Sequence, residues 1–196
     1  MKEMYRINGL RGKRIVINDF LLEDAFEMSK WGVHQSFLFG DYNFDNYDRE
    51  DFRYWYKQKT VRQNRYYSVY EGKRLIGYFG IKNISKVFKK STLGIVLDPN
   101  LLGFGYGTEI LSVFLPYYFN KFRMRKIDLE VADYNYRAIS LYEKMGFERV
   151  GYCLKRFYLD TCQISKDEIY PYLKSFEFSE NEVYQYLIKM ELKRKR

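Results

Sequence analysis

The chain has 196 residues, 46% of them hydrophobic and 30% charged, a balance typical of a globular protein with one core and not of a disordered chain. One histidine and two cysteines are too few for a zinc site of the usual Cys/His spacing, and a Ser-His or Cys-His nucleophile would depend on His34 alone. The formal charge of +9 suits either a solvated surface or a nucleic-acid surface, and the scattered lysines and arginines favour the first.

The sequence gives no sign of a membrane or secretory protein. No run of 18 apolar residues occurs, and the first residues lack an apolar signal core. We therefore expect a cytoplasmic protein in which Cys153 and Cys162 are free thiols.

The N-terminal third predicts a strand, an amphipathic helix and an acidic, aromatic segment. Residues 13–18 are apolar and β-branched, and residues 21–31 have helical apolar spacing. Residues 36–56 are rich in aromatic side chains and carry five carboxylates between positions 41 and 51. These are either solvated charges on a loop and a helix, or a wall that attracts a cation. The second interpretation makes Asp41, Asp45 and Asp48 candidates for binding a substrate.

The middle of the chain predicts a hairpin and then a crossover. Residues 66–70 and 75–81 flank a turn at 71–74, and residues 92–97 and 126–131 read as two further strands. Between these last two lie a glycine-rich turn and an apolar helix, in which Pro116 is expected to kink or end the helix. Strand, turn, helix and strand in this order indicate a sheet with parallel character.

The C-terminal part predicts one well-bounded helix and two more strands. The helix follows Asn135 and stops at Gly146, residues 147–160 and 184–192 read as strands, and residues 165–182 leave room for a short helix. No linker or repeat interrupts the chain, so residues 1–196 are expected to form a single domain.

Two stretches carry the chemistry. In the first, three alternate glycines follow a predicted strand and open a helix, which lets backbone N–H groups converge on a pyrophosphate at the positive helix end. A P-loop lysine is absent, and the glycine spacing does not fit a dinucleotide fold. A glycine-rich connection without a ligand is the alternative. The stretch consists of Leu102, Gly103, Phe104, Gly105, Tyr106, Gly107 and Thr108.

The second stretch is the helix between Asn135 and Phe147. At the two stretches together the sequence resembles the GNAT superfamily of N-acetyltransferases. The family's loop commonly reads Arg-Gly-x-Gly-Tyr/Ile-Gly-Thr, and Glu109 after it looks like the ribosomal-protein N-terminal acetyltransferase branch. The family's later helix reads Asn-x-x-Ala/Ser-x-x-x-Tyr-x-Lys-x-Gly-Phe, and every fixed position is present: Asn135, Ala138, Tyr142, Lys144, Gly146 and Phe147. The resemblance covers about residues 10–160 and the strand 184–192, with a longer connection than usual at 161–183.

The resemblance implies an α/β fold, with a mixed, centrally splayed sheet of about seven strands flanked by helices and acetyl-CoA in the gap. Backbone groups of Val96 and Leu97 would bind the pantetheine arm, and amides of the glycine loop from Leu102 to Thr108 would hold the pyrophosphate. On the later helix, Asn135, Ala138 and Lys144 would line the cofactor site. Tyr142 would also contact the cofactor and protonate the departing CoA thiolate. No metal is implied.

The sequence departs from the family pattern at two places. Leu102 replaces the basic or amide residue that opens the loop, so one side-chain contact to phosphate is missing. From Gly72 to Leu97 there is no Asp or Glu, although many members carry a glutamate base on this strand. Glu130 is then the best local candidate for the base, with a simple ion pair to a lysine as the alternative.

We therefore predict transfer of an acetyl group from acetyl-CoA, the cosubstrate, to a primary amine by direct attack in a ternary complex. The acceptor is a small cationic molecule or a protein N-terminus, with no nucleic acid or membrane as partner and a homodimer left open. The alternative is a non-catalytic acyl-CoA-binding or regulatory module of the same fold.

Overall fold

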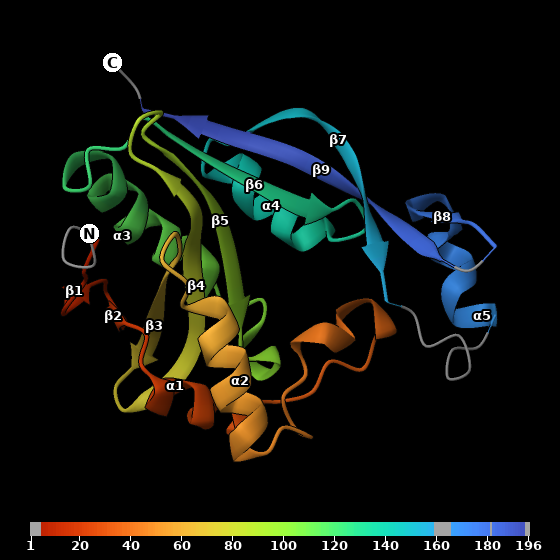
Figure 1. Ribbon diagram of the computed structural model, residues 1–196, viewed down its shortest axis with the longest axis horizontal. Coiled ribbons are helices and arrows are strands. Elements are labelled where there is room, and N and C mark those ends of the chain that lie inside the picture. The colour runs from red at the N-terminus through yellow and green to blue at the C-terminus, as the bar shows by residue number, and fades with distance from the viewer. Residues whose placement is uncertain (1–4, 159–165, 181, 195–196) are drawn as a thin grey trace. The chain divides into compact units, whose positions relative to one another are not determined.

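The computed structural model describes residues 5–158, 166–180 and 182–194. Its backbone contacts divide the chain into two compact units, residues 1–127 with 193–196, and residues 128–192. Figure 1 shows the helices and strands of each unit. A single domain over residues 1–196 stays a prediction.

The first unit is built on five strands that pair in chain order. Neighbouring strands run antiparallel from β1 to β5, and a tight turn at Gly72 (φ +58°) joins β3 to β4 as the sequence predicts. The strands are β1 (Leu10–Arg11), β2 (Ile15–Asp19), β3 (Arg65–Glu71), β4 (Arg74–Ser85) and β5 (Lys90–Leu97).

Three α-helices belong to the same unit, together with 3-10 turns at 28–30, 37–42 and 99–101: α1 (Leu22–Glu27), α2 (Arg49–Lys59) and α3 (Tyr106–Asn120). Of the two outcomes expected at Pro116, a kink or an end of the helix, the second does not occur, because α3 continues to Asn120. Phe114 and Tyr118, one on each side of the proline, are fully buried, and their packing holds the helix together where a backbone hydrogen bond is lost.

Successive side chains of β3 and β4 point to opposite faces of the sheet, which gives the unit two aromatic layers. Tyr67 and Phe79 pack against Phe114 of α3, with ring centroids 5.8 Å and 4.6 Å from it. Tyr66 and Tyr78, one residue away on each strand, point to the opposite face and join the core under α1 and α2. The sheet is therefore covered by α3 on one face and by α1 and α2 on the other.

The second unit contains the helix predicted after Asn135 and a second set of antiparallel strands. β9 pairs with β7 and with the short β8. The short helix for which residues 165–182 leave room is present as α5, which is followed by a 3-10 turn at 170–175. The β8 strand was not expected from the sequence, and Cys162 lies outside the described residues. The elements are β6 (Lys126–Ala132), α4 (Tyr136–Lys144), β7 (Glu148–Phe157), α5 (Lys166–Ile169), β8 (Phe176–Phe178) and β9 (Val183–Lys193). Among the helices described, none has the length and apolar character needed to cross a membrane.

Candidate functional site

The glycine-rich stretch forms the N-terminus of α3. Gly103 (φ +88°) and Gly105 (φ +83°) both adopt the left-handed conformation that favours glycine, and Gly105 caps the helix without a side-chain hydrogen bond. The backbone N–H groups of Tyr106, Gly107 and Thr108 donate to no other residue in the described chain. Three unbonded donors at the positive end of a 15-residue helix form a site for an anion such as pyrophosphate.

The segment that leads from β5 to this loop is anchored by Asp98, a buried carboxylate. Its oxygens accept hydrogen bonds from the backbone N–H groups of Gly32 and Asn100, both at 3.0 Å, and form an ion pair with Arg74 at 2.6 Å. The charge is therefore compensated, and three segments are fixed to one another.

Arg14, from the loop before β2, holds the other side of the glycine loop. Its guanidinium bonds the Glu109 carboxylate at 2.8 Å, donates to the Phe104 carbonyl oxygen at 3.2 Å, and stacks 4.2 Å from the centre of the Tyr106 ring. The Tyr106 hydroxyl in turn donates to Glu71 at 2.7 Å. Sequence analysis missed Arg14, because it lies 95 positions from Glu109 and no local motif marks it.

Glu109 is consequently held in its ionised form. Burial opposes its charge, but hydrogen bonds from the backbone N–H and the side chain of Arg14 outweigh that effect and lower the pKa of Glu109. The Glu109 carboxylate therefore helps to fix the conformation of the loop through Arg14. An acid in the first turn also stabilises α3, because it interacts favourably with the helix N-terminus.

The predicted pantetheine contacts lie at the end of β5. Tyr78 and Gly77 of β4 pair with Val96 and Leu97. A Cβ on Gly77 would lie 2.8 Å from the Val96 carbonyl oxygen, so glycine is required for this close strand approach. Leu102 is half-buried.

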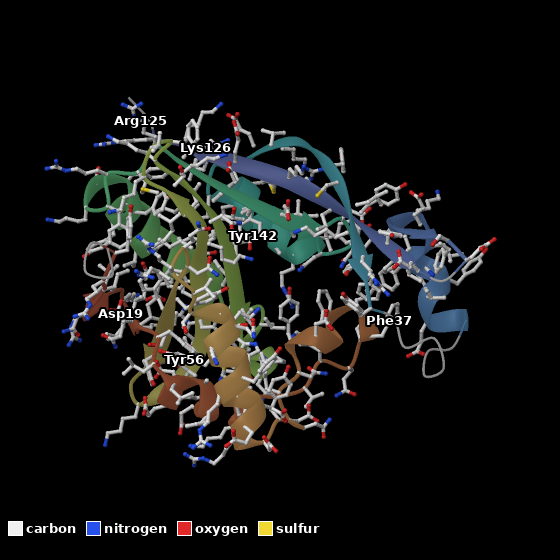
Figure 2. The ribbon with its side chains drawn as sticks, viewed as in Figure 1. Asp19, Phe37, Tyr56, Arg125, Lys126 and Tyr142 are labelled. Atoms are coloured by element: carbon white, nitrogen blue, oxygen red, sulfur yellow. The ribbon has the colours of Figure 1, made fainter. Side chains whose placement is uncertain are left out.

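The remaining predicted cofactor residues belong to the second unit. Asn135 caps α4, its side-chain oxygen accepting from the Ala138 N–H at 3.2 Å. Tyr142, labelled on α4 in Figure 2, is buried and packs 5.6 Å from the Phe147 ring centre, while Lys144 is exposed. The helix boundaries match the sequence motif, and the roles of these side chains stay predictions.

Glu130 pairs with a lysine. Its carboxylate forms an ion pair with Lys155 and accepts a weak hydrogen bond from the Cys153 thiol at 3.7 Å. Partial burial raises the pKa of Glu130, but Lys155 more than offsets this and the net shift is downward. A lower pKa makes a weaker base, and the ion pair is the arrangement that the alternative interpretation describes.

The three candidate substrate residues differ in what they contact. Asp48 is the N-cap of α2: its side chain accepts from the N–H groups of Glu50 and Asp51 at 2.7 Å and 2.9 Å. Asp41 and Asp45 are exposed and make no hydrogen bond or ion pair with any residue the structure describes. A cation would therefore meet two uncommitted carboxylates in this segment.

An aromatic cluster lies next to these acids. The Tyr47 ring packs on Phe44 and Phe52 at 5.4 Å and 5.3 Å. Burial raises the pKa of Tyr47, and the charges of Asp51 and then Asp41 add to this shift. Burial also raises the pKa of Tyr78, at the centre of the aromatic cluster, well above the usual value for tyrosine. Aromatic faces beside carboxylates favour a cation. We call this set the aromatic cluster: Phe20, Trp31, Phe44, Phe52, Trp55, Tyr66 and Tyr78.

The description "Acetyltransferase (GNAT) family" belongs to the sequence model that matches residues 33–147, more than half of the chain. The chain belongs to the GNAT family. The match includes the glycine loop and α4, so the resemblance read from these two motifs is confirmed. Acetyl-CoA is the cosubstrate of GNAT acetyltransferases, and the unbonded N–H groups at α3 fit its pyrophosphate.

Two curated relatives are similar over part of the chain. The spermidine N(1)-acetyltransferase of Vibrio cholerae is 30% identical over 88 residues, which are 45% of this chain and 51% of that protein. The N-alpha-acetyltransferase RimI of Mycobacterium tuberculosis is 33% identical over 99 residues, 48% of this chain and 58% of that protein. The matched region thus spans little more than half the length of either relative.

Solved structures show the same mixed α/β fold, which confirms the predicted fold class. A chimera of the Vibrio cholerae spermidine N-acetyltransferase SpeG and hSSAT has a TM-score of 0.68 at 19% identity, covering 92% of this GNAT chain and 96% of the chimera. The Vibrio cholerae spermidine N-acetyltransferase in complex with CoA and spermine has a TM-score of 0.63 at 18% identity, with 92% and 95% coverage.

Proposed function

We propose that this chain is an acetyl-CoA-dependent N-acetyltransferase that acts on a primary amine by direct attack in a ternary complex. The observation that carries the proposal is the set of three unbonded N–H groups at the N-terminus of α3, on a loop with glycines at its two positive-φ positions. Such a site binds the pyrophosphate of CoA without a basic side chain, which makes Leu102 tolerable at the position where the family often carries a cation.

The other residues have distinct parts in this proposal. Val96 and Leu97 offer backbone groups to the pantetheine arm, and Asn135, Ala138 and Lys144 contact the cofactor from α4. Tyr142 donates a proton to the thiolate as it leaves. Tyrosine suits this role because its hydroxyl is protonated at neutral pH and a thiolate accepts a proton readily.

We further propose that the acceptor is a cationic amine, recruited by Asp41 and Asp45. In a chain of net charge +9, these uncommitted acids form a local field that attracts what the rest of the surface repels. Tyr42 and Tyr47, which are exposed beside them, offer ring faces to the same cation. The names of the two curated relatives, a spermidine and an N-alpha-acetyltransferase, agree with an amine acceptor of either kind.

The test is a CoA-thiol release assay over a panel of polyamines, aminoglycosides, amino sugars and peptides with free N-termini. On the best acceptor, Asp41→Asn/Asp45→Asn should raise KM several-fold and weaken the salt dependence of kcat/KM, with acetyl-CoA affinity unchanged. Glu148→Gln/Glu180→Gln removes the same charge from exposed positions elsewhere and should leave KM unaltered. An unchanged KM in the first variant, or an anionic preferred acceptor, contradicts the acceptor assignment.

One observation favours the second candidate, a non-catalytic acyl-CoA-binding module. Glu130 is paired with Lys155, and β4 and β5 carry no carboxylate that could accept the amine proton. CoA binding without thiol release on any amine of the panel would support this candidate over the enzyme.

A further inference from the structure

One end of the first unit gathers exposed cations from two distant parts of the sequence. We call it the basic end: Lys86, Lys89, Lys90, Lys121, Arg123 and Arg125, all exposed. The segments that carry them, residues 82–90 and 117–127, contain no Asp or Glu. In Figure 1 the turn between β4 and β5 lies beside the start of β6, and Figure 2 labels Arg125 and Lys126 at this place.

The basic end is built by backbone hydrogen bonds rather than by chance proximity. The Lys89 carbonyl oxygen accepts from the N–H groups of Arg125 at 2.7 Å and Lys126 at 3.2 Å, and the Arg194 N–H donates to the Arg125 carbonyl at 2.9 Å. Phe122 and Met124 are buried, so the alternate residues between and beside them are turned outward. The cations are therefore held side by side by the fold.

The backbone at this end adopts unusual conformations. Asn83, Lys89 and Arg123 have φ values of 53°, 49° and 54°, and they are the non-glycine residues with positive φ in the described chain. Residues other than glycine are strained at positive φ, and the surrounding structure must hold them in this conformation. All three flank or belong to the basic end.

These charges are not neutralised within the protein. None of the six residues of the basic end forms an ion pair with another described residue. The folded state thus keeps mutually repelling cations close together, which a bound anionic partner would relieve.

The cofactor does not account for the basic end. The anion site lies at the N-terminus of α3, whereas Lys121 and Arg123 directly follow its C-terminus. A helix of 15 residues spans about 22 Å, so the two sites are separated by the length of α3.

Two large apolar side chains project from the middle of the same surface. Val87 is 85% and Phe88 71% exposed at the tip of the turn between β4 and β5, with Lys86 before them and Lys89 and Lys90 after them. An apolar pair flanked by lysines suits the boundary between lipid headgroups and acyl chains, where the apolar groups insert and the ammonium groups stay at the phosphates.

We propose that the basic end docks this protein on an anionic lipid bilayer. The lysines and arginines bind lipid phosphates, and Val87 and Phe88 insert between the headgroups. A nucleic acid would match the charge, but exposed Val87 would contribute nothing to binding it. Single-strand binders also use several stacking rings, and among the described residues of segments 82–90 and 117–127 Phe88 is the aromatic side chain that is exposed rather than partly or fully buried. A second copy of the chain would bring the same charges together. The expectation of no membrane partner came from the absence of an apolar run of 18 residues, which argues against a spanning segment and leaves contact with the bilayer surface untested.

Co-sedimentation of the full chain with vesicles tests the proposal. Vesicles of phosphatidylglycerol and phosphatidylcholine should bind it at low salt and release it at high salt, and pure phosphatidylcholine should bind it weakly. Lys86→Gln/Lys89→Gln/Lys90→Gln should weaken binding roughly 100-fold, at about fivefold per cation. Lys13→Gln/Lys57→Gln/Lys73→Gln removes the same charge from other exposed positions and should have little effect.

Variants of Val87 and Phe88 distinguish a lipid surface from a nucleic-acid surface. Val87→Ser/Phe88→Ser should weaken vesicle binding by about tenfold or more. Val150→Ser/Leu154→Ser, at exposed positions of β7, should leave it unchanged. Equal binding to charged and neutral vesicles would overturn the proposal. Unaltered vesicle binding by Val87→Ser/Phe88→Ser, with tight binding of a short RNA that the lysine variant loses, would also overturn it in favour of a nucleic-acid surface. Acetyl transfer is not needed for any arm, so the outcome is independent of the proposed function.

Discussion

Replacement of Gly105 by leucine separates the backbone strain of the loop from its role in binding CoA. At φ +83° a leucine is strained, at a cost of about 1–2 kcal/mol in the free energy of unfolding. Its Cβ would lie 3.8 Å from the Arg14 guanidinium, an ordinary contact, so no clash adds to this cost. For a chain of this length the melting temperature should fall by about 2–8 °C.

The effect on the cofactor should be larger. At a free CoA concentration about 100 times Kd, the wild type should gain about 2.7 kcal/mol, or about 5–11 °C in melting temperature. In Gly105→Leu the side chain stands at the edge of the unbonded N–H groups of α3, so this gain should disappear even at millimolar CoA. Differential scanning fluorimetry with and without CoA measures both quantities.

Gly9→Leu is the matched control. Gly9 has a positive φ of 75°, and a Cβ there would have no heavy atom within 4 Å, so it carries the same kind of strain away from the loop. This variant should melt at a similarly lowered temperature and keep the full CoA shift. A full shift in Gly105→Leu would refute the assignment of α3 as the pyrophosphate site, and its absence in wild type would refute CoA binding altogether.

Two further outcomes follow from the site. Tyr142→Phe should lower kcat about 10²- to 10⁴-fold with little change in the Kd of CoA. If the variant turned over as fast as the wild type, Tyr142 would have a packing role only. Because Arg14 lowers the pKa of Glu109, this carboxylate stabilises the fold above its unfolded value of 4.5, and the contribution is lost as pH falls through the folded pKa. Urea titrations at descending pH should therefore show Glu109→Gln less stable at neutral pH and level with wild type in acid, whereas a pH-independent difference would contradict the ion pair.

Short-range patterns predicted most of the fold. The hairpin around Gly72, the strands at 15–19 and 126–132, and the capped helix after Asn135 each follow from a few neighbouring residues, whose backbone preferences act locally. Pro116 shows the limit of this reasoning. A local rule ends the helix there, but burial of Phe114 and Tyr118 is a tertiary effect that overrides it.

The features that could not be predicted depend on contacts between residues far apart in the sequence. Arg14, in the loop before β2, bonds Glu109 in the first turn of α3, and the basic end joins Lys89 to Arg125 through backbone hydrogen bonds. Neither pairing leaves a trace in sequence spacing, because strand order and helix packing set which distant residues meet. Such contacts include those that hold the cofactor loop.

The acidic segment shows how the structure sharpens a prediction made from composition. Sequence alone treats Asp41, Asp45 and Asp48 as equivalent negative charges, yet α2 needs an N-cap and Asp48 fills that position. Its carboxylate already accepts two hydrogen bonds, so its charge is partly compensated by the N-terminus of the helix. Attraction of a cationic acceptor then falls to Asp41 and Asp45, and the variant that tests the acceptor therefore spares Asp48. Asp48→Asn would keep a capping side chain but remove the charge that stabilises the N-terminus of α2, so its effect on KM would mix helix stability with recognition.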